Sequence, residues 1–156
     1  MLIKLILMIR KLDNTVYENA KLIWKVFQLS YSVEARILNT ENFPPLKRSI
    51  KNIQESNNNF FISEIEDVVN GVIEIDEELE SIHIQSLVVL PSEFRKGIAS
   101  KMLDFILDLY KKNKITVETG VDNIPAVNLY LRFKFNEIFQ WDTDHGVRKI
   151  RFELIN

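Results

Sequence analysis

The chain has 156 residues, of which 46% are hydrophobic and 27% are charged, and its 20 Lys and Arg against 22 Asp and Glu give a formal net charge of −2. This composition predicts a single globular domain, residues 1–156, and excludes the disordered, collagen-like and solenoid classes. Because cysteine is absent, disulfides, thiolate metal sites and cysteine nucleophiles are excluded, and two histidines far apart in the sequence give no reason to expect a metal.

The first predicted element is the N-terminal run 1–9, which is apolar except for Lys4. It is too short to span a bilayer and lacks a small-residue cleavage site. A buried strand is therefore a better interpretation than a degenerate signal sequence. We expect no membrane association and a cytoplasmic location.

Helical patterns follow as far as residue 55. Apolar residues recur at steps of three and four over 15–29, and a second helical piece is predicted at 31–38. The sequence Phe43-Pro44-Pro45-Leu46 forces an extended break, because each proline disfavours helix in the residue before it. A short helix is predicted at 46–55.

Strand patterns begin at Phe60 and later alternate with helices. Asn70-Gly71 is a hairpin signal, and Gly97 is the entry to a long amphipathic helix. We predict strands at 60–66, 71–75 and 81–90, a helix at 98–110, a strand at 115–119, a helix at 125–133, and closing strands at 135–141 and 147–154. This order predicts an α/β (α+β) fold with a mixed sheet and helices on its faces.

Charge is distributed unevenly along the chain. Residues 52–94 contain ten acids and no Lys or Arg, which leaves 20 basic and 12 acidic residues elsewhere. Either the acids decorate solvated strand edges, or they create a negative field that attracts a cationic ligand. No basic stripe with interleaved aromatic residues is present, so nucleic acid is not an expected partner.

The segment 87–100 combines a strand, a polar turn and a helix start. The first amides of a helix lack intrahelical partners and carry the positive end of the helix dipole, so such a junction binds anions. Gly97 and Ala99 are small where a phosphate must approach the backbone, and Arg95 and Lys96 add positive charge. The other interpretation is that Gly97 only eases the turn. Neither a Walker loop nor a dinucleotide fingerprint is present.

This turn resembles motif A of the GNAT superfamily of acyl-CoA-dependent N-acyltransferases, [QR]-x-x-G-x-[GA]. Gly97 and Ala99 match its small positions, and Phe94 stands where Gln or Arg is usual. A second block is similar to the family's N-x-x-A-x-x-L-Y-x-x-x-G-F. It is matched at Asn123, Ala126, Leu129, Tyr130 and Phe135, with Lys134 where glycine is usual.

The resemblance implies a GNAT-like, mostly antiparallel sheet of six to seven strands with about four helices, splayed between its fourth and fifth strands. The pantetheine arm of acetyl-CoA would lie in that gap, because backbone groups exposed by splaying need partners. Leu87, Val88 and Val89 would position the thioester, and Asn123 would bond the arm or cap its helix. The diphosphate site would comprise Phe94, Arg95, Lys96, Gly97, Ile98, Ala99 and Ser100.

The implied activity is N-acetyl transfer from acetyl-CoA to a primary amine, which requires a base because an alkylammonium has a pKa near ~10.4. His83 lies at the strand position where some family members carry a proposed base, with Glu80 and Glu34 in reserve. The other interpretation is that His83 only packs or forms a hydrogen bond within its strand. Tyr130 would protonate the departing thiolate. Because no cysteine can form an acyl-enzyme, direct attack in a ternary complex is expected.

The resemblance places the acceptor wall at Tyr31, Glu34, Phe43 and Pro44, on the helices before the sheet. The acid-rich strands would flank the entrance and favour a small cationic amine, a polyamine, or a lysyl or N-terminal amine. A non-catalytic CoA-binding or protein-interaction module on the same fold is the alternative. Edge strands near the C-terminus make a homodimer possible.

Overall fold

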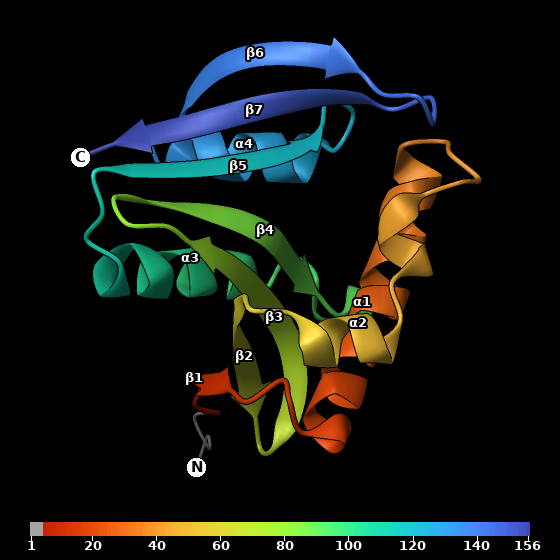
Figure 1. The fold of residues 1–156 in the computed structure, drawn as a ribbon, viewed down its shortest axis with the longest axis vertical. Helices are drawn as coiled ribbons and strands as arrows, with labels where there is room; N and C mark the ends of the chain where they lie inside the picture. The colour runs from red at the N-terminus through yellow and green to blue at the C-terminus, as the bar shows by residue number, and fades with distance from the viewer. Residues whose placement is uncertain (1–4) are drawn as a thin grey trace.

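A mixed sheet forms the centre of the molecule, which is described for residues 5–156 by a computed structural model (Figure 1). Within those residues the sheet has seven strands in the order β1-β2-β3-β4-β5-β7-β6. Neighbouring strands are antiparallel except β4 and β5, which are parallel. The strands are β1 Met8–Leu12, β2 Asn59–Ile65, β3 Val68–Glu77, β4 Ser81–Val89, β5 Lys114–Gly120, β6 Asn136–Asp142 and β7 Arg148–Ile155.

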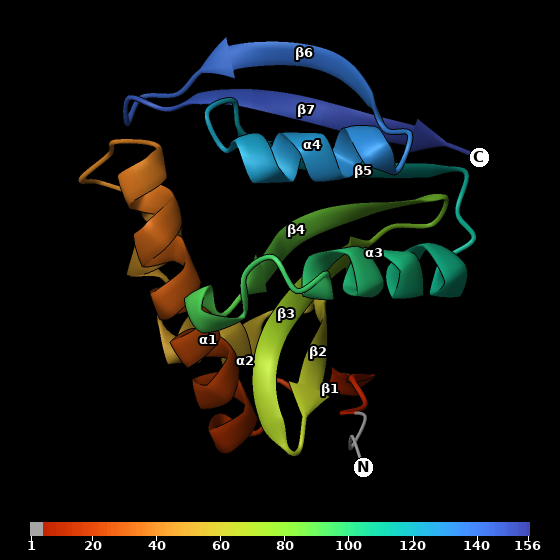
Figure 2. The same ribbon diagram turned by 180° about the vertical axis from the view of Figure 1, so that it is seen from behind.

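Helices cover both faces of this sheet. In the described residues they are α1 Tyr17–Ile37, α2 Ile50–Glu55, α3 Ile98–Leu109 and α4 Ile124–Arg132, with short 3-10 turns at Pro44–Lys47 and Pro91–Glu93. Helices α3 and α4 lie on one side of the sheet, and α1 and α2 lie on the other (Figures 1 and 2). None of the helices in residues 5–156 is long and apolar enough to cross a membrane.

Successive side chains of the strands pack alternately into two hydrophobic cores, one on each face of the sheet. Phe61 and Ile73 face α3, whereas Phe60, Ile62 and Val72 face α1. These five residues are buried because successive side chains of a strand point to opposite faces. The predicted α/β class, with a mostly antiparallel sheet of six to seven strands, is confirmed.

Three local predictions need correction. Residues 1–4 of the predicted first strand lie outside the described residues. Leu5 and Ile6 are exposed, and β1 is a largely exposed edge strand that begins only at Met8. The two helical pieces over 15–38 form the single helix α1.

The hairpin signal at Asn70-Gly71 was also wrong. The turn between β2 and β3 falls at Glu66 and Asp67, which both have positive φ. Gly71 instead lies inside β3, where a Cβ would come 2.6 Å from Ser63 Oγ and 2.8 Å from Met102 Sδ. This glycine therefore permits close packing of α3 on the sheet.

Candidate active site

The parallel strands β4 and β5 separate halfway along their length. They are paired from Ser81 and Lys114 to Ile84 and Val117, and no pairs follow. The register between β3 and β4 shifts at the same place, so Gln85 is an extra residue on β4. Such a bulge bends the strand that carries it. The edges beyond the bulge are left with backbone groups that need partners, as the predicted splay requires.

A turn with two left-handed residues leads from β4 into α3. Arg95 has a φ of 64° and Gly97 has a φ of 77°. Gly97 is the N-cap of α3 and provides no side-chain cap, so the first amides of the helix have no protein partner from that source. Free amides at a helix start are the groups that a diphosphate would need, and the diphosphate site stays a prediction.

Two cations lie beside this turn, and each contacts another side chain. Lys96 Nζ lies 2.9 Å from Glu93 Oε2, which neutralises part of its charge. Arg132 comes from α4, and its Nη2 lies 3.4 Å from Ser100 Oγ at the start of α3. Sequence reasoning missed Arg132, because the packing of α4 against α3 is not visible in either motif.

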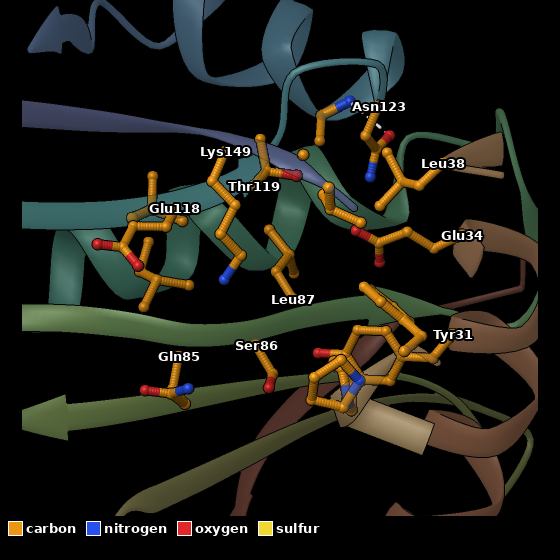
Figure 3. A pocket seen from close by; sticks show the side chains of 18 of the residues that line it. Tyr31, Glu34, Leu38, Gln85, Ser86, Leu87, Glu118, Thr119, Asn123 and Lys149 are labelled. Carbon is orange, nitrogen blue, oxygen red and sulfur yellow. Dashed lines mark hydrogen bonds between the residues drawn. The ribbon is translucent and has the colours of Figure 1, made fainter. Parts of the chain in front are cut away.

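A cavity of about 390 Å³ opens where β4 and β5 separate. Its wall includes seven of the predicted site residues: Tyr31, Glu34, Phe43, Pro44, Leu87, Asn123 and Tyr130. These residues come from α1, the segment after it, β4, and α4 with its N-cap, and Figure 3 shows Tyr31, Glu34, Leu87 and Asn123 around the cavity together with Lys149 of β7. The structure thus brings the predicted acceptor wall and the predicted acid together.

A buried ion pair supports the floor of the cavity. Arg48 Nη1 and Nη2 lie 2.6 and 2.9 Å from the two carboxylate oxygens of Glu74, which is fully buried. Asn58 and Ser86 also donate to this carboxylate, at 2.8 and 3.1 Å. Because Ser86 lies on β4 beside the bulge, the network fixes the acceptor side of that strand.

Tyr130 is well placed to hold a proton at the cavity. Its ring packs 5.5 Å from Phe135 and 5.8 Å from Phe152 between ring centroids, and only 4% of the residue is exposed. Burial, and then the nearby Glu34, raise the pKa of the Tyr130 hydroxyl. The phenol therefore stays protonated through the neutral range, as an acid must.

Glu34 and Asn123 meet at the same wall. Burial raises the pKa of the Glu34 carboxyl, while a hydrogen bond from Asn123 and the charge of Lys149 act in the opposite direction. Asn123 Oδ1 also accepts from the amide of Ala126 at 3.4 Å (Figure 3). The structure thus places Asn123 as the N-cap of α4, one of its two predicted roles.

The predicted base, His83, is not among the residues that line the cavity. It pairs with Thr116 in the closed part of the β4–β5 ladder, and its Nδ1 lies 2.7 Å from Thr116 Oγ1. Burial lowers the pKa of His83, with smaller effects from nearby charges, so its ring is neutral near pH 7.

A carboxylate that the motifs did not highlight does line the cavity. Glu118 is the first β5 residue beyond the paired segment, and its Oε2 accepts from Arg151 Nη1 at 3.0 Å. Its place at the point of divergence depends on where pairing stops, which only the structure reveals.

Several other predicted residues do not reach this cavity. The side chains of Val88 and Val89 are buried in the two cores, and Phe94 is 41% exposed near the start of α3. Glu80, the other reserve base, lies outside the cavity wall. None of the ten acids of residues 52–94 lines the cavity either. Glu64 of β2, for example, pairs with Arg10 of β1 at the β1 edge of the sheet. These acids therefore do not form the cavity wall, and their position beside its entrance stays a prediction.

In the part of the chain that the structure describes, no three His, Asp and Glu side chains are grouped to hold a metal ion. A sheet split beside an uncapped helix start, with a buried tyrosine in the cavity at the split, is the arrangement typical of acyl-CoA-dependent acyltransferases.

Comparison with known proteins identifies the family. The model of the acetyltransferase (GNAT) family matches residues 20–135, and the chain belongs to that family.

The chain is also similar to individual proteins. The UPF0157 protein YqkA of Bacillus subtilis is 34% identical over 109 residues, which are 69% of this chain but only 32% of the relative, so the chain spans about a third of it. An N-alpha-acetyltransferase of Sulfurisphaera tokodaii is 25% identical over 66% of this chain and 71% of its own. The PaiA N-acetyltransferase of Thermoplasma acidophilum, solved with coenzyme A, has the same fold (TM-score 0.75, 15% identity, 97% and 99% coverage).

Proposed function

We propose that residues 1–156 act as one catalytic unit that moves an acetyl group from acetyl-CoA to a primary amine, in the cytoplasm where this donor is available. The observation that carries the proposal is the continuity of the site. The β4–β5 gap begins near the α3 turn and ends in a cavity lined by Tyr130 and two carboxylates.

The donor half of the site fits an acetyl-CoA molecule. Free amides at the start of α3, with Arg95 and Arg132 nearby, suit the diphosphate. The unpaired edges of β4 and β5 suit the amide-bearing arm, and Leu87 lies where the arm would reach the cavity. When bound, acetyl-CoA supplies an activated thioester carbonyl.

The acceptor must lose a proton before its nitrogen can attack. We infer that Glu118 accepts this proton, because it is the carboxylate at the point where the strands separate. His83, the prediction from sequence, lies just outside the cavity and would reach the amine only through a water molecule. Comparing Glu118→Gln with His83→Gln separates the two assignments, since only loss of the base abolishes the acidic limb of the pH–rate profile.

Tyr130 completes the proton balance. The amine nitrogen bonds to the acetyl carbon, the carbon–sulfur bond breaks, and the thiolate takes the proton held on the Tyr130 oxygen. The acetylated nitrogen loses its extra proton to become the neutral amide, and this proton returns to the Tyr130 oxygen directly or through water. Because the chain has no cysteine, the acetyl group passes directly to the amine within a ternary complex.

The acceptor wall is aromatic and enclosed. Tyr31 packs between Phe27 and Phe43, with ring centroids 5.6 and 5.8 Å apart. The name of the archaeal relative, an N-alpha-acetyltransferase, supports a peptide or small-molecule α-amine rather than a polyamine. A homodimer through the exposed edge strand β6 stays a prediction.

Thiol release from acetyl-CoA, measured with a panel of amines, tests this function. We expect acceptor-dependent release and mass-spectrometric detection of the acetylated amine. Saturable acetyl-CoA binding without turnover of any amine would contradict it and favour the non-catalytic CoA-binding module.

A further inference from the structure

The acceptor half of the cavity contains an ammonium that forms no ion pair with any acid of residues 5–156. We infer that the acceptor carries a carboxylate close to its reacting amine, and that Lys149 binds this carboxylate. The inference rests on the proposed function and narrows its acceptor to amines bearing a carboxylate.

Lys149 differs from the other cations of its strand. Arg148 Nη1 lies 2.9 Å from Asp142, and Arg151 Nη1 lies 3.0 Å from Glu118. Across residues 5–156, no acidic oxygen lies within 4 Å of the Lys149 ammonium. Figure 3 shows this ammonium directed into the cavity between Glu118 and Leu87.

The acids of the cavity do not neutralise this charge. Glu118 is engaged by Arg151, and Glu74 beneath the floor is engaged by Arg48. Glu34 lies across the cavity on α1, outside ion-pair range of Lys149, and its burial favours the neutral carboxyl. A half-buried ammonium without a counterion is unfavourable, and a ligand carboxylate would relieve it.

A second unpartnered polar atom lies in the same wall. His145, from the loop between β6 and β7, lines the cavity, and its Nε2 is buried without a hydrogen-bond partner among the described residues. Its Nδ1 faces Asp144 at 3.3 Å. Buried polar atoms are normally paired, so an unpaired one in a cavity wall indicates a ligand contact. Because Asp144 can only accept, the proton of a neutral ring lies on Nδ1, and Nε2 is free to accept an N–H of the acceptor while Lys149 donates to its carboxylate.

The cavity also limits the acceptor's size. Its volume of about 390 Å³ must hold the acetyl end of the donor as well as the acceptor's amine. One ammonium suits a singly charged carboxylate rather than a phosphate, for which arginine pairs are typical. The carboxylate can belong to a free amino acid or to an acidic residue that follows a peptide's N-terminus.

Matched acceptors and matched lysine variants test the inference. We would measure kcat/KM for α- and ω-amino acids against amines of the same length that lack the carboxylate. A second arm compares an alanyl-aspartyl peptide with its alanyl-asparaginyl counterpart, which separates the two carboxylate sources. The variants are Lys149→Met, Lys149→Arg and, as a control, Lys25→Met on the exposed surface of α1.

The expected pattern is specific to the carboxylate. In the native chain, acceptors with a carboxylate should have a higher kcat/KM than their matched amines. Lys149→Met should lower kcat/KM for them by about 10- to 100-fold, as expected for a hydrogen-bonded charge, with most of the change in KM. Lys149→Arg should recover most of this loss. Uncharged amines, the Lys25→Met control and the calorimetric Kd for acetyl-CoA should change less than about threefold.

Two results would overturn the inference, and they are distinguishable. Turnover with no preference for the carboxylate, or an equal effect of Lys149→Met on both members of each pair, removes the assignment of Lys149 and leaves the acetyltransferase intact. Acetyl-CoA binding without turnover of any amine removes the proposed function and this inference together.

Discussion

Substitution of Gly97, the N-cap of α3, distinguishes an effect on protein stability from an effect on acetyl-CoA binding. Gly97 has a φ of 77°, a left-handed conformation that costs a residue with a Cβ roughly 1–2 kcal/mol. A Cβ built on Gly97 meets no protein atom within 4 Å, so backbone strain is the only cost to the free protein. We expect Gly97→Ala to lower the free energy of unfolding by about 1–2 kcal/mol, or the melting temperature by roughly 2–8 °C.

The same substitution should weaken donor binding by a larger factor. The added methyl group lies at the first free amides of α3, where the diphosphate must approach the backbone. Losing one charge-assisted hydrogen bond costs about 1.5–3 kcal/mol, which corresponds to a roughly 10- to 100-fold higher Kd for acetyl-CoA.

Gly146 provides a matched control for this experiment. It has a φ of 82°, its Cβ would also meet nothing within 4 Å, and it lies in the turn between β6 and β7. Gly146→Ala should reproduce the stability loss without the affinity loss. Thermal melts would measure the stability, and titration calorimetry the acetyl-CoA Kd, of the native chain and the two variants. Equal acetyl-CoA Kd values for Gly97→Ala and Gly146→Ala would refute the assignment of the α3 turn as the diphosphate site.

Three further substitutions test other parts of the site. Tyr130→Phe should lower kcat by ~10² or more with little change in the Kd for acetyl-CoA, as measured by stopped-flow thiol release and calorimetry; unchanged turnover would remove the acid assignment. Arg48→Met leaves the buried Glu74 carboxylate unpaired and should cost about 3–5 kcal/mol in urea denaturation, whereas a loss below 1 kcal/mol would show that the pair is not structural. Burial raises the pKa of Glu34, so its contribution to stability is present at low pH and is lost as pH rises through the folded pKa. Glu34→Gln should therefore gain stability relative to the native chain from about pH 4 to pH 8 in paired melts, and a constant difference would contradict that shift.

The amino-acid sequence predicted the site best where a short local motif determines the geometry. The turn at Gly97 and the helix carrying Tyr130 lie where the motif spacing placed them, because strand, turn and helix start are local structures. By contrast, the extended break predicted at Phe43-Pro44-Pro45-Leu46 is a 3-10 turn at Pro44–Lys47, and the helix predicted at 46–55 begins only at Ile50.

Features that depend on packing were not predictable from one sequence. The β2–β3 turn moved to Glu66 and Asp67 because α3 packs against Gly71, a contact between segments far apart in the chain. The acids of residues 52–94 do not line the cavity, although residues 84–87 of the same segment do, because the fold rather than the composition decides which side chains face it. Lys149 reaches the site because β7 pairs with β5 along the edge of β5 that faces away from β4.

The central claim is that this chain transfers an acetyl group, and it is tested most directly by mass spectrometry of the acceptor. The purified protein would be incubated with acetyl-CoA and an amine that carries a carboxylate. Our account predicts an acceptor heavier by one acetyl group and an equal amount of free coenzyme A, both lost in Tyr130→Phe. Release of coenzyme A without an acetylated amine, or no release despite donor binding, would contradict it.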